Sequence, residues 1–118
     1  MADITKAYEN AVTSNTADKI ERTGVIKDGN IKLSTRKPVD LGNGFFGTVK
    51  SMSFSDRKGV EILIPTIVNG KPVSDKTAIA HYYKTGEHLG IYTSPEAADK
   101  AANRIHEAEE KRIKRLGY

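Results

Sequence analysis

The chain has 118 residues, of which 37% are hydrophobic and 29% are charged, and these proportions suit one small soluble domain with some additional chain. It contains no cysteine, which excludes disulfides, thiolate catalysis and cysteine-based zinc sites. A formal net charge of +4 favours contact with nucleic acid or an acidic protein surface, but it is also ordinary for proteins that bind neither.

The sequence predicts neither a membrane span nor a signal peptide. No apolar run approaches the roughly 18 residues of a membrane-spanning helix. The first residues, MADITKAYEN, carry acids and no apolar stretch. We therefore expect no membrane among the partners.

Residues 1–41 predict an arm and linker, because this segment holds too little apolar surface to fold alone. Apolar residues at helical spacing predict a short amphipathic helix over residues 4–12, and a weaker helix runs through 16–24. Asp28-Gly29-Asn30 predicts the turn of a small hairpin, and residues 35–44 are typical of a linker.

We expect this arm to become ordered against the compact domain or against a partner protein. Its apolar side chains would then be the partner contacts, and deletion of residues 1–36 would leave a folded domain. The expected contacts are Ile4, Tyr8, Val12, Ile31 and Leu33.

Residues 42–118 predict a compact unit. Strands are expected over 48–54 and 60–68, then a tight turn at Asn69-Gly70 and short strands over 71–73 and 89–93. Ser74 is expected to cap one helix that stops at Gly86. Ser94-Pro95-Glu96 starts a second helix, which runs to about Arg115.

This order of elements predicts an α+β fold, with a small, mostly antiparallel sheet packed by two helices. One face of the sheet and the two helices would together form a single core. Its expected members are Ile62, Ile64, Val68, Ile79, Ala98, Ala101 and Ile105.

Residues 42–49, GNGFFGTV, fit the nucleotide-loop pattern G-x-G-x-x-G-x-V. A dinucleotide loop follows a strand and opens a helix, whereas here a linker precedes the glycines and a strand follows. A kinase would also need a lysine on a later strand, an H-R-D loop and a D-F-G motif, which the chain lacks. We expect flexible backbone entering a strand, with Phe45 or Phe46 over the core edge, and no nucleotide cofactor.

The histidines do not predict a metal centre, since zinc needs three or four converging ligands and His81 and His88 lie on either side of a helix stop. We expect His88 to tie a loop by hydrogen bonds and His106 to lie on a solvated face. No paired carboxylates or Ser-His-Asp spacing stand out. The sequence therefore predicts a protein that is not an enzyme and that holds no metal.

The last helix ends in a basic cluster formed by Lys111, Arg112, Lys114 and Arg115. Pairing with glutamates one turn earlier and the favourable charge at a helix C-terminus account for most of it. Contact with nucleic-acid phosphates is the alternative interpretation.

Four ordered motifs carry a family resemblance: SMS at 51–53, EILIPTIV at 61–68, SDKTAIAHYYKTGEHLG at 74–90 and TSPEAAD at 93–99. Together they make residues 47–112 resemble a small domain that recurs in tailed-bacteriophage virion-associated proteins. Lys50 stands where an arginine is usual in that domain.

The resemblance implies a non-enzymatic structural or accessory protein of the virion, present in the host cytoplasm during assembly. Its implied partners are other particle proteins of the capsid, portal or tail, bound through the N-terminal arm. The resemblance also implies that the chain belongs to a symmetric homo-oligomeric assembly.

A second, shorter stretch, HLGIYTSPEAADKAANRIHEA at 88–108, is similar to the end of an AP2-type DNA-binding domain. Such domains lay a three-stranded sheet in the major groove and read bases with Arg and Trp. This chain has no Trp, so DNA contacts would fall to strand and turn residues and to the basic cluster. The alternative is therefore a small DNA-binding phage protein that uses Lys50, Arg57, Lys58 and Lys71.

Overall fold

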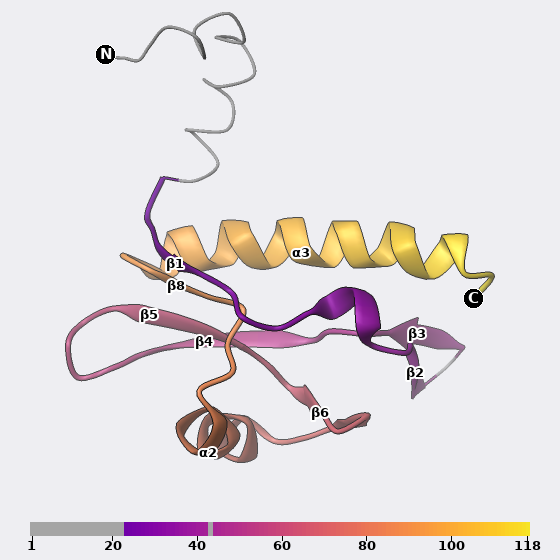
Figure 1. Ribbon diagram of the computed structural model, residues 1–118, viewed down its shortest axis with the longest axis horizontal. Coiled ribbons are helices and arrows are strands. Elements are labelled where there is room, and N and C mark those ends of the chain that lie inside the picture. Colours follow the sequence, from indigo (N-terminus) through magenta and orange to yellow (C-terminus); the bar gives the residue numbers. More distant parts are fainter. Residues whose placement is uncertain (1–22, 43) are drawn as a thin grey trace, which may run out of the picture.

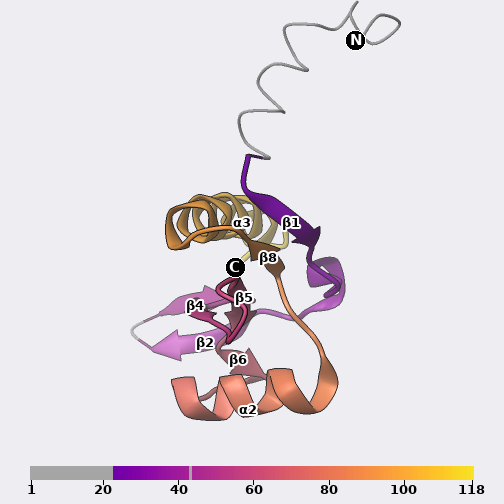
Figure 2. The same cartoon turned by 90° about the vertical axis from the view of Figure 1, so that its left-hand side faces the viewer.

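A four-stranded antiparallel sheet lies between two helices in the computed structural model, which describes residues 23–42 and 44–118 (Figure 1). Helix α3 (Pro95–Arg115) covers one face and helix α2 (Asp75–Thr85) the other (Figure 2). The predicted α+β class is confirmed. No helix in these described residues is long and apolar enough to cross a membrane.

The sheet has the strand order β1-β8-β5-β4, so β1 and β4 form its edges. Two further strand pairs, β2 with β3 and β6 with β7, stand beside it, and a short 3-10 helix, η2, precedes β2. The bounds are β1 Val25–Asp28, η2 Leu33–Thr35, β2 Val39–Gly42, β3 Phe45–Gly47, β4 Ser51–Ser55, β5 Glu61–Pro65, β6 Ile67–Val68, β7 Lys71–Pro72 and β8 Gly90–Tyr92.

Both helices begin at the serines that the sequence predicts as caps. The hydroxyl of Ser74 accepts a hydrogen bond from the backbone N–H of Thr77, and that of Ser94 accepts one from Ala97. Each side chain satisfies an amide that has no partner within the first helical turn. Gly86 ends α2 in the left-handed conformation, with a φ of 76°.

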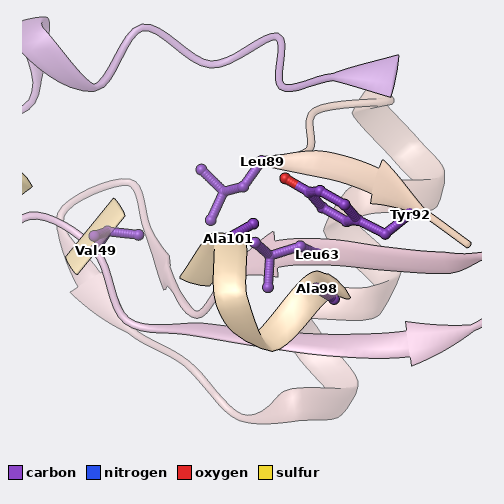
Figure 3. Packing of buried hydrophobic residues seen from close by; sticks show 6 residues of the cluster. All are labelled: Val49, Leu63, Leu89, Tyr92, Ala98 and Ala101. Atoms are coloured by element: carbon purple, nitrogen blue, oxygen red, sulfur yellow. The ribbon is translucent and has the colours of Figure 1, made fainter. Parts of the chain in front are cut away.

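The core consists of two clusters, which corrects the single core expected from the sequence. Leu63 faces α3 and packs with residues of β8 and of that helix (Figure 3), whereas Ile62 and Ile64 face α2 and pack against Ala78. Neighbouring side chains of a strand point to opposite faces of the sheet. Because a helix covers each face, β5 is buried along its whole length.

β1 is an edge strand of the sheet, so the hairpin expected at Asp28-Gly29-Asn30 does not form. Val25 lies opposite Tyr92 of β8, and Asp28 lies opposite Gly90. A Cβ atom at Gly29 would lie 2.6 Å from the carbonyl oxygen of Leu89. The glycine is therefore needed for close approach to the chain before β8, and not for a turn.

Asn30 completes this connection. Its backbone N–H donates to the carbonyl of His88 at 3.0 Å, while its side chain accepts from the N–H of His88 at 2.8 Å and donates to the carbonyl of Gly86 at 3.0 Å. Three hydrogen bonds thus fasten the chain after β1 to the loop that joins α2 to β8.

The structure also corrects the predicted boundary between arm and domain. Ile31 and Leu33, expected to contact a partner, pack against the chain's own core on the α3 side. The expected linker contains η2 and β2. Residues 25–41 therefore form part of the same fold as residues 42–118, while Ile4, Tyr8, Val12 and the helix predicted over residues 4–12 lie outside the described residues.

Candidate functional site

A buried carboxylate joins helix α3 to the segment after β3. Glu109 is 8% exposed, and it accepts a hydrogen bond from the hydroxyl of Thr48. It also accepts from Arg112, whose Nη2 lies 2.9 Å from Oε1 and whose Nε lies 3.2 Å from Oε2. This two-point contact is the strong geometry for an arginine and a carboxylate.

Arg112 also binds the backbone of the segment before β2. Its Nη2 lies 3.0 Å from the carbonyl oxygen of Leu33 and 3.1 Å from that of Arg36. The guanidinium thereby fastens η2 to α3. The sequence placed Arg112 among the candidate nucleic-acid contacts, but its donors are directed into the chain's own fold.

Arg36 extends the network across the fold. Its Nη1 donates to the carbonyl of Thr48 at 3.0 Å and to that of Ile67 at 2.9 Å. Burial lowers the pKa of Arg36, and the nearby charges of Glu87 and Glu109 oppose that effect. We call Arg36, Thr48, Glu109 and Arg112 the buried network.

The buried network holds Glu109 as a carboxylate. Burial alone would raise the pKa of its carboxyl, but the hydrogen bonds from Arg112 and Thr48 outweigh burial and lower the pKa below its usual value. The same contact raises the pKa of Arg112. Glu109 is therefore unsuited to supply a proton near neutral pH, and we assign the network a structural role.

The buried network holds the β2–β3 hairpin beside helix α3, and these two elements form the walls of a groove. Thr48 directly follows the β2–β3 hairpin and is bonded to Glu109, so the hairpin is held against the C-terminal half of α3. Between the two walls lies a cavity of about 710 Å³. We call it the aromatic groove; its apolar lining is Leu41, Phe45, Phe46, Val49, Ile113 and Tyr118.

The end of α3 places Tyr118 in this groove. Gly117 adopts a φ of 95°, its N–H donates to Lys114, and the N–H of Tyr118 donates to Ile113. These are the two hydrogen bonds of a Schellman motif, in which the residue after the glycine turns back onto the helix. The ring of Tyr118 lies 5.2 Å from that of Phe46.

The aromatic groove leaves large apolar side chains in contact with solvent. Phe45 is 69% exposed, Phe46 41% and Tyr118 57%, and Leu116 beside them is 54% exposed. This corrects the expectation that Phe45 or Phe46 covers the core edge. Exposed aromatic side chains gathered around a hollow are typical of a protein-binding surface.

Charged groups of both signs surround the apolar lining. Lys50 and Lys114 line the groove together with Glu107 and Glu110. His106 also lines it and is exposed, as predicted, with its Nε2 3.4 Å from the hydroxyl of Ser51. The lining therefore suits an apolar partner segment flanked by charges.

His88 does not tie its loop with its side chain, which corrects the sequence prediction. The residue is 2% exposed, and neither ring nitrogen has a hydrogen-bond partner among the described residues. Burial, and then the charge of Lys27, lower the pKa of the ring. The loop is tied instead by the side chain of Asn30.

Among the other titratable side chains, Glu61 is 6% exposed and accepts hydrogen bonds from the hydroxyls of Ser53 and Ser55. His81 lies 3.2 Å from Glu87 at the surface. In residues 23–42 and 44–118, no group of three or more His, Asp or Glu converges as a metal site would require.

The remaining basic residues from the sequence analysis are exposed but lie on different parts of the molecule. Arg57 and Lys58 are in the β4–β5 turn, at the opposite end of the molecule from the C-terminus of α3, where Lys111, Lys114 and Arg115 lie (Figure 1). Lys50 precedes β4, and Lys71 lies on β7.

Comparison of the chain with protein-family models, with curated proteins and with solved structures gives no match. Its function has to be inferred from its own residues and from the geometry of the aromatic groove.

Proposed function

We propose that the chain is a non-enzymatic accessory protein of a tailed-bacteriophage particle, which binds other particle proteins through the aromatic groove. The motifs at residues 51–99 support the phage context by resemblance. The observation that carries the docking role is the exposed set Phe45, Phe46 and Tyr118 around a hollow. Aromatic side chains of this kind are enriched at protein interfaces.

This proposal moves the partner surface away from part of the predicted arm. Ile31 and Leu33 pack, half-buried, against the chain's own core, so less of their apolar surface is left for a partner. The aromatic groove takes their place, because its apolar side chains remain exposed. A partner would bury them, and burial of apolar surface favours association.

Binding is favoured over catalysis by the state of the groove's polar residues. Glu109 is engaged by Arg112 and Thr48. The hydroxyl near His106 belongs to Ser51, but the 3.4 Å between them is long for activation of a nucleophile. These contacts suit a rigid surface.

The alternative, an AP2-like DNA-binding protein, is disfavoured by the helices. An AP2-type domain reads DNA with an open sheet face, whereas α3 and α2 cover the two faces of this sheet. The alternative predicts duplex binding that weakens steeply with salt. Fluorescence anisotropy with a labelled duplex at low salt tests the alternative. Duplex binding that is lost when the basic residues are replaced would support it.

The docking role is tested in particles of the phage that encodes the chain. Replacing Phe45 and Phe46 together by serine should reduce the copies per nuclease-treated particle at least tenfold, as measured by quantitative mass spectrometry. Tyr83→Ser is the matched control, since Tyr83 is 66% exposed on α2, away from the groove. Normal incorporation of the double-serine variant would refute the docking role of the groove.

A further inference from the structure

The aromatic groove is an apolar surface that needs an apolar occupant, and the chain's own sequence contains one. Residues 4–12 carry Ile4, Ala7, Tyr8, Ala11 and Val12 at the spacing of one helix face. We propose that residues 4–12 of a second copy of this chain bind in the aromatic groove. This inference rests on the proposed role of the groove as a docking surface, and it names a neighbouring copy of the chain in the particle as the protein that docks there.

The chemistry of the two surfaces matches. An amphipathic helix binds a groove through anchors at positions i, i+3, i+4 and i+7, which is the spacing of residues 4, 7, 8 and 11. The exposed rings of Phe45, Phe46 and Tyr118 offer faces and edges to Tyr8 and to the aliphatic anchors.

Charge supports the same pairing. The segment carries charges of both signs beside its apolar stripe, namely Asp3, Lys6 and Glu9. The groove lining also carries both signs, with Lys50 and Lys114 opposite in charge to Glu107 and Glu110. Opposite charges at the edge of an interface add little affinity, but they select the partner and its direction.

The position where the arm joins the fold favours a second copy over the same chain. The carbonyl of Gly24 accepts from the N–H of Thr93, so the arm joins beside the N-terminus of α3. The groove lies along the other half of α3, from Asn103 onward. β1 and the β2–β3 hairpin accordingly lie at opposite ends of this helix (Figure 1).

Reach limits binding within one chain. The groove is centred about 20 Å along α3 from Ala97, at 1.5 Å per residue. A connector over residues 13–24 that is helical from 16, as its sequence predicts, spans about 24 Å at most. To reach the groove of the same chain, the connector would have to reverse direction and run straight along α3. A connector that barely spans this distance gives the tethered segment a very low effective concentration at the groove.

The resulting contact is heterologous, because the arm of one copy meets the groove of the next. Repetition of such a contact produces a closed ring or an open filament. Ordering the segment costs backbone entropy at every residue, so a single contact is weak. Closure of a ring holds every arm at once and offsets this cost.

The test uses the full-length chain and two complementary variants. Ile4→Asp with Tyr8→Asp disables the arm and leaves the groove intact, whereas Phe45→Ser with Phe46→Ser disables the groove and leaves the arm intact. In sedimentation velocity, the unmodified chain should associate as its concentration rises, and each variant should remain monomeric. An equimolar mixture of the two variants should form dimers and nothing larger, since one working arm meets one working groove.

Two controls match these changes. Asn10→Asp with Thr13→Asp adds the same charge to the segment away from its apolar stripe, and Tyr83→Ser removes an exposed ring elsewhere. Both should associate like the unmodified chain, and thermal unfolding should show that all four variants are folded.

Three results would each overturn the arm-in-groove contact. The unmodified chain could stay monomeric, either disabled variant could still associate by itself, or the mixture of the two variants could form no dimer. The particle experiment separates this failure from that of the proposed function. If the chain is monomeric but the double-serine variant is lost from particles, the groove docks another protein. If that variant is incorporated normally, the docking role itself fails.

Discussion

Arg112 stands in a run of four basic residues, yet its guanidinium is directed inward. It binds Glu109 and two carbonyls from the segment before β2. Its neighbours Lys111, Lys114 and Arg115 are exposed. The sequence alone does not distinguish Arg112 from its exposed neighbours, because the carbonyl groups that bind its guanidinium belong to a segment more than 70 positions earlier in the chain. One turn of helix thus presents both a structural cation and surface cations.

Replacement of Arg112 by alanine should lower the free energy of unfolding by about 3 kcal/mol, since it leaves the buried Glu109 carboxylate without its partner cation. Urea unfolding followed by circular dichroism measures the change. Lys111→Ala, one position earlier and exposed, should cost less than about 0.5 kcal/mol. Equal losses in the two variants would mean that the buried network contributes little.

His88 should make the protein less stable as the pH falls below about 6.5, the ordinary pKa of histidine. Burial and Lys27 lower the pKa of His88 in the folded chain. Between the two pKa values the unfolded chain binds a proton that the folded chain does not, so the stability present above this window is lost on acidification. Unfolding free energies from pH 7.5 to 5 measure the slope.

His88→Gln should flatten that slope, because glutamine carries no proton in this range. The exposed His106 provides the control, and His106→Gln should keep the slope of the unmodified chain. An unchanged slope in His88→Gln would assign the pH dependence to other groups. Glu109, whose pKa is also lowered, adds a further loss only at more acidic pH.

Among the elements, the helix ends follow from local sequence signals, whereas strand β1 depends on pairing with a distant strand. The ends of α2 and α3 follow from Ser74, Gly86 and Ser94, each of which acts on its own few neighbours. These ends were predictable from sequence. β1 depends on β8, which lies some 60 residues later, and its glycine resembles a turn signal until the partner strand is known.

Deletion of residues 1–36 should therefore abolish the cooperative unfolding transition that deletion of residues 1–22 retains. The difference between the two truncations is the loss of β1, of the apolar contacts of Ile31 and Leu33, and of the hydrogen bonds of Arg36. Thermal unfolding of both truncations makes the comparison. The sequence analysis expected the opposite, namely that deletion of residues 1–36 leaves a folded domain. Equal stability of the two truncations would show that residues 23–36 are not needed for the fold.

The aromatic groove, like β1, depends on a contact between distant parts of the chain and could not be predicted from local sequence. Phe45 or Phe46 was expected to lie over the core edge, where large apolar residues are usually buried. Their exposure depends on where the β2–β3 hairpin stands, and the contact between Thr48 and Glu109 fixes that position across 61 residues of sequence. The Gly-rich motif could exclude a nucleotide loop, but it could not reveal which way the two rings face.

At the scale of the whole molecule, one strand serves two cores. Leu63 belongs to the cluster under α3 and Ile64 to the cluster under α2, although the two residues are neighbours in the chain. Their side chains leave opposite faces of the sheet. Each helix can therefore repack on its own side of β5.

Leu63→Val and Ile64→Val should each lower the free energy of unfolding by roughly 0.5–1.5 kcal/mol, the usual cost of removing or shifting one methyl group in a core. The double variant should lose the sum within about 0.5 kcal/mol, because the two side chains leave opposite faces of the sheet and belong to different clusters. A double-mutant cycle by urea unfolding measures this. A coupling above 1 kcal/mol would show that the two clusters form one core.

The pairing of β1 with β8 has a consequence for synthesis of the chain. Translation proceeds from the N-terminus at about 5–20 residues per second. β1 therefore leaves the ribosome several seconds before the strand to which it bonds, since β8 follows about 60 residues later. The β4–β5 pair, joined by a short turn, is complete first. During this interval the nascent β1 has an unpaired edge, and on a polysome it lies near identical edges of neighbouring chains.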